Sequence, residues 1–204
     1  LISKGSKVFI GHRNGLSCYQ GDSVAHIQTE ARIIRSLKKL PNNDILIGAA
    51  DGLYILKDDV VSKIPIENDV DLYPVYCIEI MDNNRFWIGN PNGIFMVSNG
   101  VAKKYRLGNS SGHNFINFLL KENDEILWAG TNHGIYEIAI QSFENDALVL
   151  RNYTPEDGIR SYETNLNAAF KSKDGTLWFG TINGAIMFKR SSSTSEVSIP
   201  RPIL

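Results

Sequence analysis

Short hydrophobic runs alternate with polar turns along the whole chain, and the same order recurs five times. Each copy has a hydrophobic run, a glycine, two or three variable residues, and then Asn, Asp or His followed by glycine and a second hydrophobic run. The first glycines are Gly11, Gly48, Gly89, Gly130 and Gly180, with spacings of 37, 41, 41 and 50 residues. A period of about 40 residues made of short strands is typical of β-propeller blades. The pattern predicts an all-β fold of four-stranded antiparallel blades, with about five repeats.

The last repeat shows the predicted unit most clearly. Its three strands and one hairpin turn are expected at Leu166–Lys171, Lys173–Thr176 (the turn), Leu177–Thr181 and Ala185–Lys189. Asp-Gly and Asn-Gly pairs favour the tight turns between such strands. The fourth strand is predicted at Val101–Tyr105 and Leu148–Thr154 in earlier repeats, and the best helical window, Ala31–Lys38, is interpreted as strand.

Three recurring residue types carry packing predictions. The glycine that closes each second strand is expected to allow close approach of neighbouring backbone or a local kink. Trp87, Trp128 and Trp178 occupy equivalent positions and are predicted to lie in the core between blades. The two cysteines, Cys18 and Cys77, are expected to be free, small hydrophobic side chains rather than a disulfide pair.

The predicted domain organisation is one set of propeller repeats over residues 1–190 and an exit linker over 191–204 toward a following domain. Few residues precede Val8, so the first blade is expected to be partial and to lack its first strand. About four further blades follow. We expect a fragment of a larger, seven-bladed propeller.

Composition excludes several function classes. The 204 residues are 43% hydrophobic and carry a net charge of −1 without a basic stripe, which argues against nucleic-acid or membrane contact by this fragment. No apolar run approaches the roughly 20 residues of a membrane span. Motifs for nucleophilic catalysis, phosphate binding or metal ligation are lacking, so we expect no catalytic residue, no cofactor and no metal. A metal site at His12 and His133 is less expected than solvated turn residues, and the acidic pairs Asp58-Asp59 and Glu156-Asp157 are expected to be solvated.

A binding surface remains as the candidate site. In a propeller, the turns between second and third strands emerge on the same face as the connections from fourth to first strands. The candidate ligand-binding residues on this face are Arg13, Tyr73, Asn92, His113, Asn132, His133, Tyr162, Asn165 and Asn183. Their planar polar groups and rings suit a polyhydroxylated ligand. Turn chemistry alone can account for Asn92 and Asn183, as it can for Asn14 and Asp51, whereas nothing in it requires Tyr73, His113 or Tyr162.

The residues also carry a family resemblance. Leu127–Tyr136 and Leu177–Gly184 resemble the two-component regulator propeller repeat, whose consensus is roughly Asp-Gly-x-Leu-Trp-x-Gly-Thr-x-x-Gly-Leu. The stretch Tyr153–Phe188 looks like the last blade of the sensor domain in that family. The resemblance also implies that a β-sandwich domain follows the exit linker at residues 191–204. The resemblance weakens in the first two repeats, where the tryptophan is missing.

This resemblance implies the periplasmic part of a hybrid two-component sensor of Bacteroidetes type. Such a fragment would bind an oligosaccharide or another small polar ligand, form a homodimer through the complete ectodomain, and signal to a histidine kinase and a DNA-binding response regulator outside it. Two other classes stay open. The propeller could be a protein-interaction or dimerisation scaffold without a small-molecule ligand, or an enzyme such as a lyase or quinoprotein, which would need a metal or cofactor cluster.

Overall fold

The computed structural model describes residues 1–68, 71–145 and 147–190 of the chain. The chain divides into two compact units, Leu1–Tyr105 (unit 1) and Arg106–Leu204 (unit 2). The predicted exit linker, residues 191–204, lies outside the described residues.

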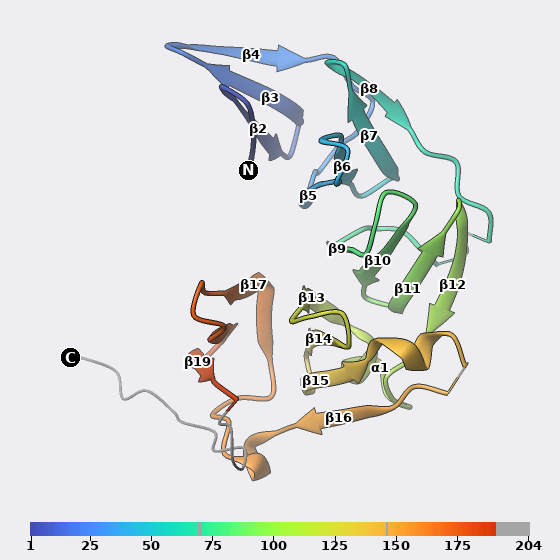
Figure 1. The fold of residues 1–204 in the computed structure, drawn as a ribbon, viewed down its shortest axis with the longest axis vertical. Helices are drawn as coiled ribbons and strands as arrows, with labels where there is room; N and C mark the ends of the chain where they lie inside the picture. The colour runs from blue at the N-terminus through green and yellow to red at the C-terminus, as the bar shows by residue number, and fades with distance from the viewer. Residues whose placement is uncertain (69–70, 146, 191–204) are drawn as a thin grey trace. The chain divides into compact units, whose positions relative to one another are not determined.

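Unit 1 consists of three four-stranded antiparallel sheets (Figure 1), each with its strands paired in chain order. The first sheet contains β1 (Ile2–Lys4), β2 (Lys7–His12), β3 (Gly15–Gln20) and β4 (Ser23–Ile27). The second contains β5 (Ser36–Lys39), β6 (Ile45–Gly48), β7 (Leu53–Lys57) and β8 (Val60–Lys63). The third contains β9 (Cys77–Ile80), β10 (Arg85–Asn90), β11 (Gly93–Ser98) and β12 (Val101–Tyr105).

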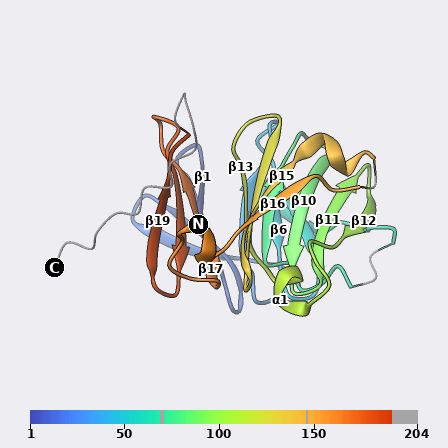
Figure 2. The ribbon, with the colours of Figure 1, turned by 90° about the horizontal axis from the view of Figure 1, so that it is seen from below.

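Unit 2 contains two more sheets and three short helical turns. The first sheet contains β13 (Ile116–Lys121), β14 (Ile126–Thr131), β15 (Gly134–Ala139) and β16 (Leu150–Tyr153). The second contains β17 (Thr164–Lys171), β18 (Leu177–Thr181) and β19 (Gly184–Phe188). The helical turns are α1 (Ser111–Asn114), η1 (Ile140–Phe143) and η2 (Pro155–Asp157). Helix α1 lies at one end of the strands that follow it (Figure 2).

The predicted fold class is confirmed, because every sheet is an antiparallel blade of a β-propeller. Two of the strand predictions were wrong. The first blade has its first strand, β1, which pairs with β2 through Ile2↔Phe9 although it is only three residues long. Within Ala31–Lys38 only the end is strand, because β5 begins at Ser36 and the preceding residues form the connection from the first sheet.

In most of the sheets the third strand begins with a glycine, directly after the turn that follows the second strand. In unit 2 the turn Asn132–His133 is closed by the pair Thr131↔Gly134, and Gly134 has φ +107°. A Cβ at Gly134 would lie 2.5 Å from the Tyr153 carbonyl oxygen. Any other residue at position 134 would therefore prevent β16 from approaching this closely. The special backbone conformation thus belongs to the glycine and not to the Asn or His before it.

The glycines that end the second strands make room for side chains rather than for backbone, which corrects the prediction. A Cβ at Gly48 would lie 2.4 Å from Val75 Cγ1, and a Cβ at Gly130 would lie 2.1 Å from Phe118 Cε1. Both intruding side chains belong to buried hydrophobic clusters. The recurring glycine therefore marks a position where a side chain from another part of the unit occupies the space that a Cβ would take.

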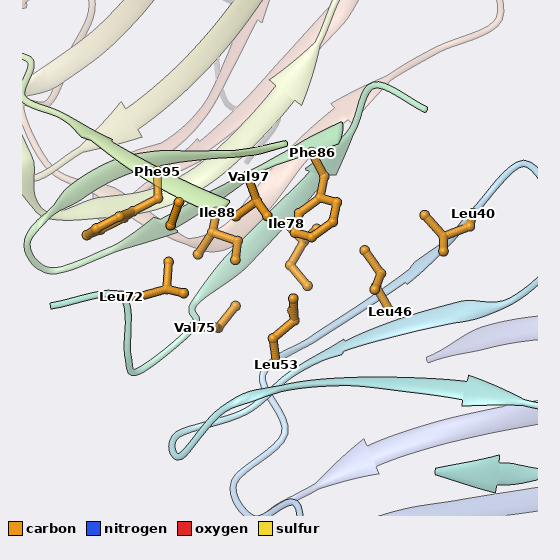
Figure 3. Packing of buried hydrophobic residues seen from close by; sticks show 11 residues of the cluster. Leu40, Leu46, Leu53, Leu72, Val75, Ile78, Phe86, Ile88, Phe95 and Val97 are labelled. Carbon is orange, nitrogen blue, oxygen red and sulfur yellow. The ribbon is translucent and has the colours of Figure 1, made fainter. Parts of the chain in front are cut away.

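The second sheet separates two hydrophobic cores in unit 1. Leu46 faces the core that it shares with the third sheet, including Ile78, Phe86 and Ile88 (Figure 3). Its sequence neighbours Ile45 and Ile47 face the core shared with the first sheet, which contains Phe9, Leu16 and the free, buried Cys18. Because successive strand residues point to opposite faces, one run of three apolar residues serves two cores.

Trp128 and Trp178 have the same place in their blades but different burial. Trp128 is 1% exposed and packs against Phe179 and Phe188, with ring centroids 5.3 and 4.9 Å away. Trp178 points to the opposite face from Phe179 and is half-buried, in register with Phe170, which is 62% exposed. The prediction that all three tryptophans are core is correct for Trp87 and Trp128 and wrong for Trp178.

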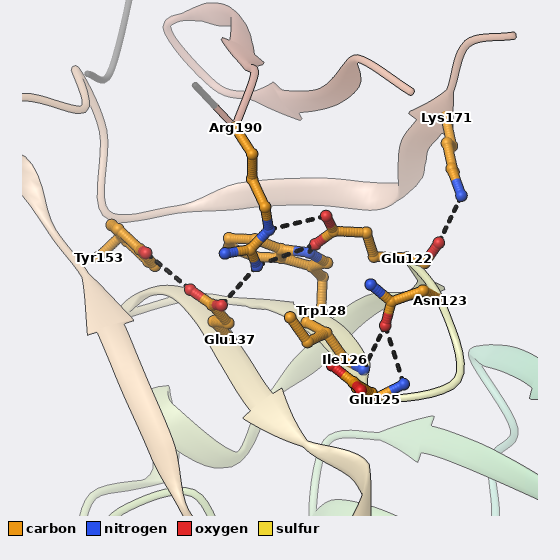
Figure 4. A network of polar contacts seen from close by, with 9 residues as sticks. All are labelled: Glu122, Asn123, Glu125, Ile126, Trp128, Glu137, Tyr153, Lys171 and Arg190. Atoms are coloured by element: carbon orange, nitrogen blue, oxygen red, sulfur yellow. Dashed lines mark hydrogen bonds and ion pairs between the residues drawn. The ribbon is translucent and has the colours of Figure 1, made fainter. Parts of the chain in front are cut away.

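An ionic network closes one edge of the unit 2 core (Figure 4). Arg190 binds Glu122 and Glu137, and its guanidinium lies 6.0 Å from the Trp128 ring centroid. The Trp128 indole nitrogen donates a hydrogen bond of 2.7 Å to Glu122. Burial alone would raise the pKa of Glu122, but the hydrogen bonds from Arg190 and Trp128 outweigh it and lower that pKa. The network thus joins Arg190, two residues beyond β19, to Trp128 of β14, to Glu137 of β15 and to Glu122, the residue after β13.

Candidate functional site

The turns and the connections predicted to share one face do meet within each unit. In unit 1 the Ile33 amide donates to the Arg13 carbonyl at 2.8 Å, and the Asn92 side-chain amide donates to the Asp71 carbonyl at 3.2 Å. In unit 2 the Gly134 amide donates to the Tyr162 carbonyl at 2.7 Å. These hydrogen bonds place the variable side chains of turns and connections side by side.

Three predicted site residues, His113, His133 and Tyr162, come together in unit 2. The rings of His113 and His133 lie edge to face with centroids 4.2 Å apart. The rings of His133 and Tyr162 are stacked, with centroids 5.0 Å apart and an interplanar angle of 28°. We call these three residues, together with their hydrogen-bond partners Tyr136 and Glu156, the His–Tyr cluster.

The connection that carries His113 is shaped by Asn114 and Gly108. Asn114 is buried, and its side chain accepts a hydrogen bond from the Leu107 amide and donates to the carbonyls of Gly108 and Ser110. A Cβ at Gly108 would lie 2.8 Å from His113 Cγ, so the glycine leaves the space that the imidazole occupies. A buried amide and a glycine therefore fix the direction of the His113 ring.

His133 and Tyr162 are placed by backbone contacts. The His133 amide donates to the Thr131 hydroxyl at 2.9 Å, and its carbonyl accepts a 3.2 Å bond from the Asn152 side chain. The Tyr162 carbonyl accepts the hydrogen bond from the Gly134 amide, and the residue is 37% exposed. His133 is exposed as well. The cluster thus presents two ring side chains to solvent from a fixed backbone.

Tyr136 and Glu156 are the cluster members that the sequence analysis missed. Tyr136 lies in β15, is 2% exposed, and forms a hydrogen bond with Nδ1 of His113. Burial raises the pKa of Tyr136 to about 12, so its hydroxyl keeps its proton and can donate to a neutral His113. Burial, followed by the proximity of His133, lowers the pKa of His113. In the sequence Tyr136 is one apolar-pattern residue among many, and no signal there distinguishes it.

Glu156 is exposed, as predicted for a solvated acidic residue, but it is held in place. Its carboxylate accepts hydrogen bonds of 2.6 Å from the Thr154 hydroxyl and 2.6 Å from the Tyr162 hydroxyl. These two bonds, the Thr154 bond first, lower the pKa of Glu156 to about 2. The site therefore holds an ionised carboxylate beside the stacked rings.

The three predicted asparagines of unit 2 serve mainly to hold loops. Asn132 accepts a 2.7 Å hydrogen bond from the buried Asn117 side chain. Asn165 donates to the Thr181 carbonyl at 2.9 Å, and Asn183 donates to the Arg160 carbonyl at 3.1 Å. Asn132 lies next to His133 in the turn, whereas no contact joins Asn165 or Asn183 to the cluster rings among the described interactions.

The three predicted residues of unit 1 do not form a comparable group. Arg13 is exposed in its turn, and Asn92 is tied to the Asp71 carbonyl and, through its own amide, to Asn90 at 2.7 Å. Tyr73 is half-buried and packs against the hydrophobic core of the second and third sheets. His12, which the sequence offers with His133 as a less expected metal site, lies within unit 1 with Nε2 3.0 Å from the Ser17 hydroxyl.

Across residues 1–68, 71–145 and 147–190, no three His, Cys, Asp or Glu side chains are grouped so that they could hold a metal ion. Within the same ranges, no helix has the length and apolar character needed to cross a membrane.

Solved structures share this fold over nearly the whole chain. The extracellular domain of a proposed one-component system from B. thetaiotaomicron superposes with a TM-score of 0.75 and 16% identity over 97% of this chain and 30% of that one. The extracellular domain of a proposed hybrid two-component system from the same organism gives 0.71 and 17% over 98% and 32%. The chain therefore shares the fold of these extracellular domains.

Enzymes share the fold too. Virginiamycin B lyase from Staphylococcus aureus gives a TM-score of 0.70 and 20% identity over 99% of this chain and 69% of that one. No protein-family profile matches the sequence, and no curated protein sequence matches it. The chain spans about a third of the length of the extracellular domains it resembles. At these identities the comparisons establish the propeller fold and do not decide between binding and catalysis.

Proposed function

We propose that this chain is part of the extracytoplasmic, periplasmic sensor of a two-component system, and that it binds an oligosaccharide at the His–Tyr cluster without catalysing a reaction. The observation that carries the proposal is the group of His113, His133, Tyr162 and Glu156 at the turn-and-connection end of unit 2. The fold it shares with the extracellular domains of proposed sensor systems supports the sensing role.

The chemistry of the cluster suits a sugar. Sugar rings offer C–H faces that pack on aromatic rings and hydroxyls that need both donors and acceptors. His133 and Tyr162 supply exposed ring surface, the imidazoles supply nitrogen donors and acceptors, and Glu156 supplies acceptor oxygens. These groups are held by hydrogen bonds of the backbone and of neighbouring side chains before a ligand arrives, which lowers the entropic cost of binding.

Signalling would follow from a population shift. An oligosaccharide that binds one arrangement of a sensor homodimer better than another moves the equilibrium toward that arrangement. The histidine kinase and the DNA-binding response regulator that respond to it would lie outside residues 1–204.

Calorimetry of the 204-residue chain against neutral oligosaccharides tests the proposal. We expect binding by the wild type and a Kd about fivefold weaker for Tyr162→Ala, because a stacked aromatic contact contributes roughly 1 kcal/mol. Tyr19→Ala is the matched control, because Tyr19 is 42% exposed on β3 of unit 1. The absence of heat from every oligosaccharide, with a folded protein by circular dichroism, would refute the proposal.

A second candidate is a protein-interaction or dimerisation scaffold. The outer strands of unit 1 favour it, because Val24 on β4 and Val60 on β8 are each 65% exposed. If the chain dimerises through these strands without binding any sugar, changing both valines to serine will abolish the dimer in sedimentation experiments.

A further inference from the structure

The carboxylate of Glu156 is bound by neutral groups, and the cationic form of His133 also lowers its pKa. Its carboxylate is bound by two hydroxyl groups, those of Thr154 and Tyr162, which are neutral. Among the residues that the structure describes, Glu156 forms no ion pair with a lysine or arginine. Its neighbour Asp157 differs, because it lies 3.8 Å from Arg151 and accepts the Thr154 amide at 3.0 Å.

The other members of the cluster do not compensate this charge above the titration range of histidine. Burial, and then the nearby His133, lowers the pKa of His113, which favours its neutral form. Tyr136 and Tyr162 keep their phenolic protons, since burial raises the pKa of the former and the bond to Glu156 raises that of the latter. The titrations described below are therefore set at pH 8, above the ordinary histidine pKa of about 6.5. The cluster then carries one negative charge, at Glu156.

We propose that the His–Tyr cluster accepts saccharides without negative charge and rejects uronic-acid and sulfated ones, a selectivity that rests on the function proposed above. Hydroxyl groups of an uncharged sugar donate to the free lone pairs of the Glu156 carboxylate. A carboxylate or sulfate in the same place offers it no proton and is repelled. Two unit charges about 4 Å apart in water-like surroundings change Kd about fivefold.

Matched sugars and matched variants test the charge alone. The probes are gluco-, galacto- and manno-tetraoses and the uronic-acid tetramers of the same linkage, titrated at pH 8 and low salt. Glu156→Gln keeps an oxygen for the Tyr162 hydroxyl but removes the charge. Glu163→Gln is the control, because it removes the same charge from an exposed residue of the same connection.

The wild type is expected to bind at least one neutral tetraose about fivefold or more tightly than its uronic counterpart. Glu156→Gln is expected to bring the two affinities together, whereas Glu163→Gln preserves the difference. Equal or tighter binding of uronic tetramers by the wild type would overturn the selectivity but leave the sensing proposal intact. A lack of binding to every tetramer of either kind would overturn both.

Discussion

The guanidinium of Arg190 binds the carboxylate of Glu122 through two nitrogens, with Nε 2.8 Å from Oε1 and Nη2 3.1 Å from Oε2 (Figure 4). Bidentate pairs of this kind have defined geometry as well as charge. The Arg190 side chain is 44% exposed and that of Glu122 is 12% exposed. The pair therefore lies at the boundary between the unit 2 core and solvent, and it ties the end of the last described blade to the blade before it.

Removal of the guanidinium should lower the stability of unit 2. We expect Arg190→Met to reduce the free energy of unfolding by about 1 kcal/mol, because Glu122 and Glu137 lose a shared partner but the site remains accessible to water. The measurement is urea denaturation followed by Trp fluorescence. Lys189→Met is the control, because Lys189 is exposed and makes no hydrogen bond or ion pair in the described part of the chain. Equal midpoints for the two variants would contradict the prediction.

The two equivalent tryptophans of unit 2 should respond differently to truncation. Trp128→Ala is expected to cost about 3–5 kcal/mol, as for other fully buried large aromatic residues. Trp178→Ala should lower the free energy of unfolding by about 1–2 kcal/mol, since the side chain is already partly exposed. Denaturation monitored by far-ultraviolet circular dichroism compares them directly. A larger loss for Trp178→Ala would mean that its face of the sheet is covered.

Gly130 should tolerate no side chain. A Cβ would lie 2.1 Å from Cε1 of Phe118, whose ring is stacked on Phe179 with centroids 5.4 Å apart. We expect Gly130→Ala to cost about 1–3 kcal/mol by overpacking. Gly112→Ala is the control, because the nearest atom to its Cβ would be His133 Cβ at 3.6 Å. A thermal midpoint unchanged by Gly130→Ala would show that the Phe118 ring can move aside freely.

His113 should make stability depend on pH. Its pKa in the folded chain lies below the ordinary value of 6.5, chiefly through burial and then through His133. Between those two values the unfolded chain binds more protons, so stability is full above pH 6.5 and falls as the pH drops through 6.5 toward the folded pKa. Urea midpoints at pH 7.5 and 5.5 measure this.

The His113→Asn variant isolates the effect. An asparagine oxygen can accept the Tyr136 hydroxyl in place of Nδ1 but does not titrate. The variant should lose less stability than the wild type between pH 7.5 and 5.5, whereas His26→Asn, at an exposed histidine of β4, should behave as the wild type does. Identical losses for His113→Asn and the wild type would disprove the role of His113.

The sequence by itself determined the strands and their turns. The runs predicted at Leu177–Thr181 and Val101–Tyr105 coincide with β18 and β12, because alternating side chains and turn glycines are local properties of the chain. It also predicted that turns and connections share a face, and this brought His113, His133 and Tyr162 into the candidate list. Local rules say less where a segment is short, which is why β1 was missed.

Only the tertiary structure decided which polar residues contact one another and which already use their side chains in hydrogen bonds to the backbone. The hydroxyl of Tyr136 reaches His113 from a strand 23 residues away, and the Tyr162 hydroxyl recruits Glu156. Asn165 and Asn183 look equally suited to a ligand in the sequence, yet their amides hold backbone carbonyls. Trp178 and Trp128 occupy equivalent positions in their blades. They differ in burial because different groups pack against the two side chains. The physical reason is common to all four: burial and hydrogen bonding depend on what packs opposite a side chain, and one strand's own sequence does not contain that information.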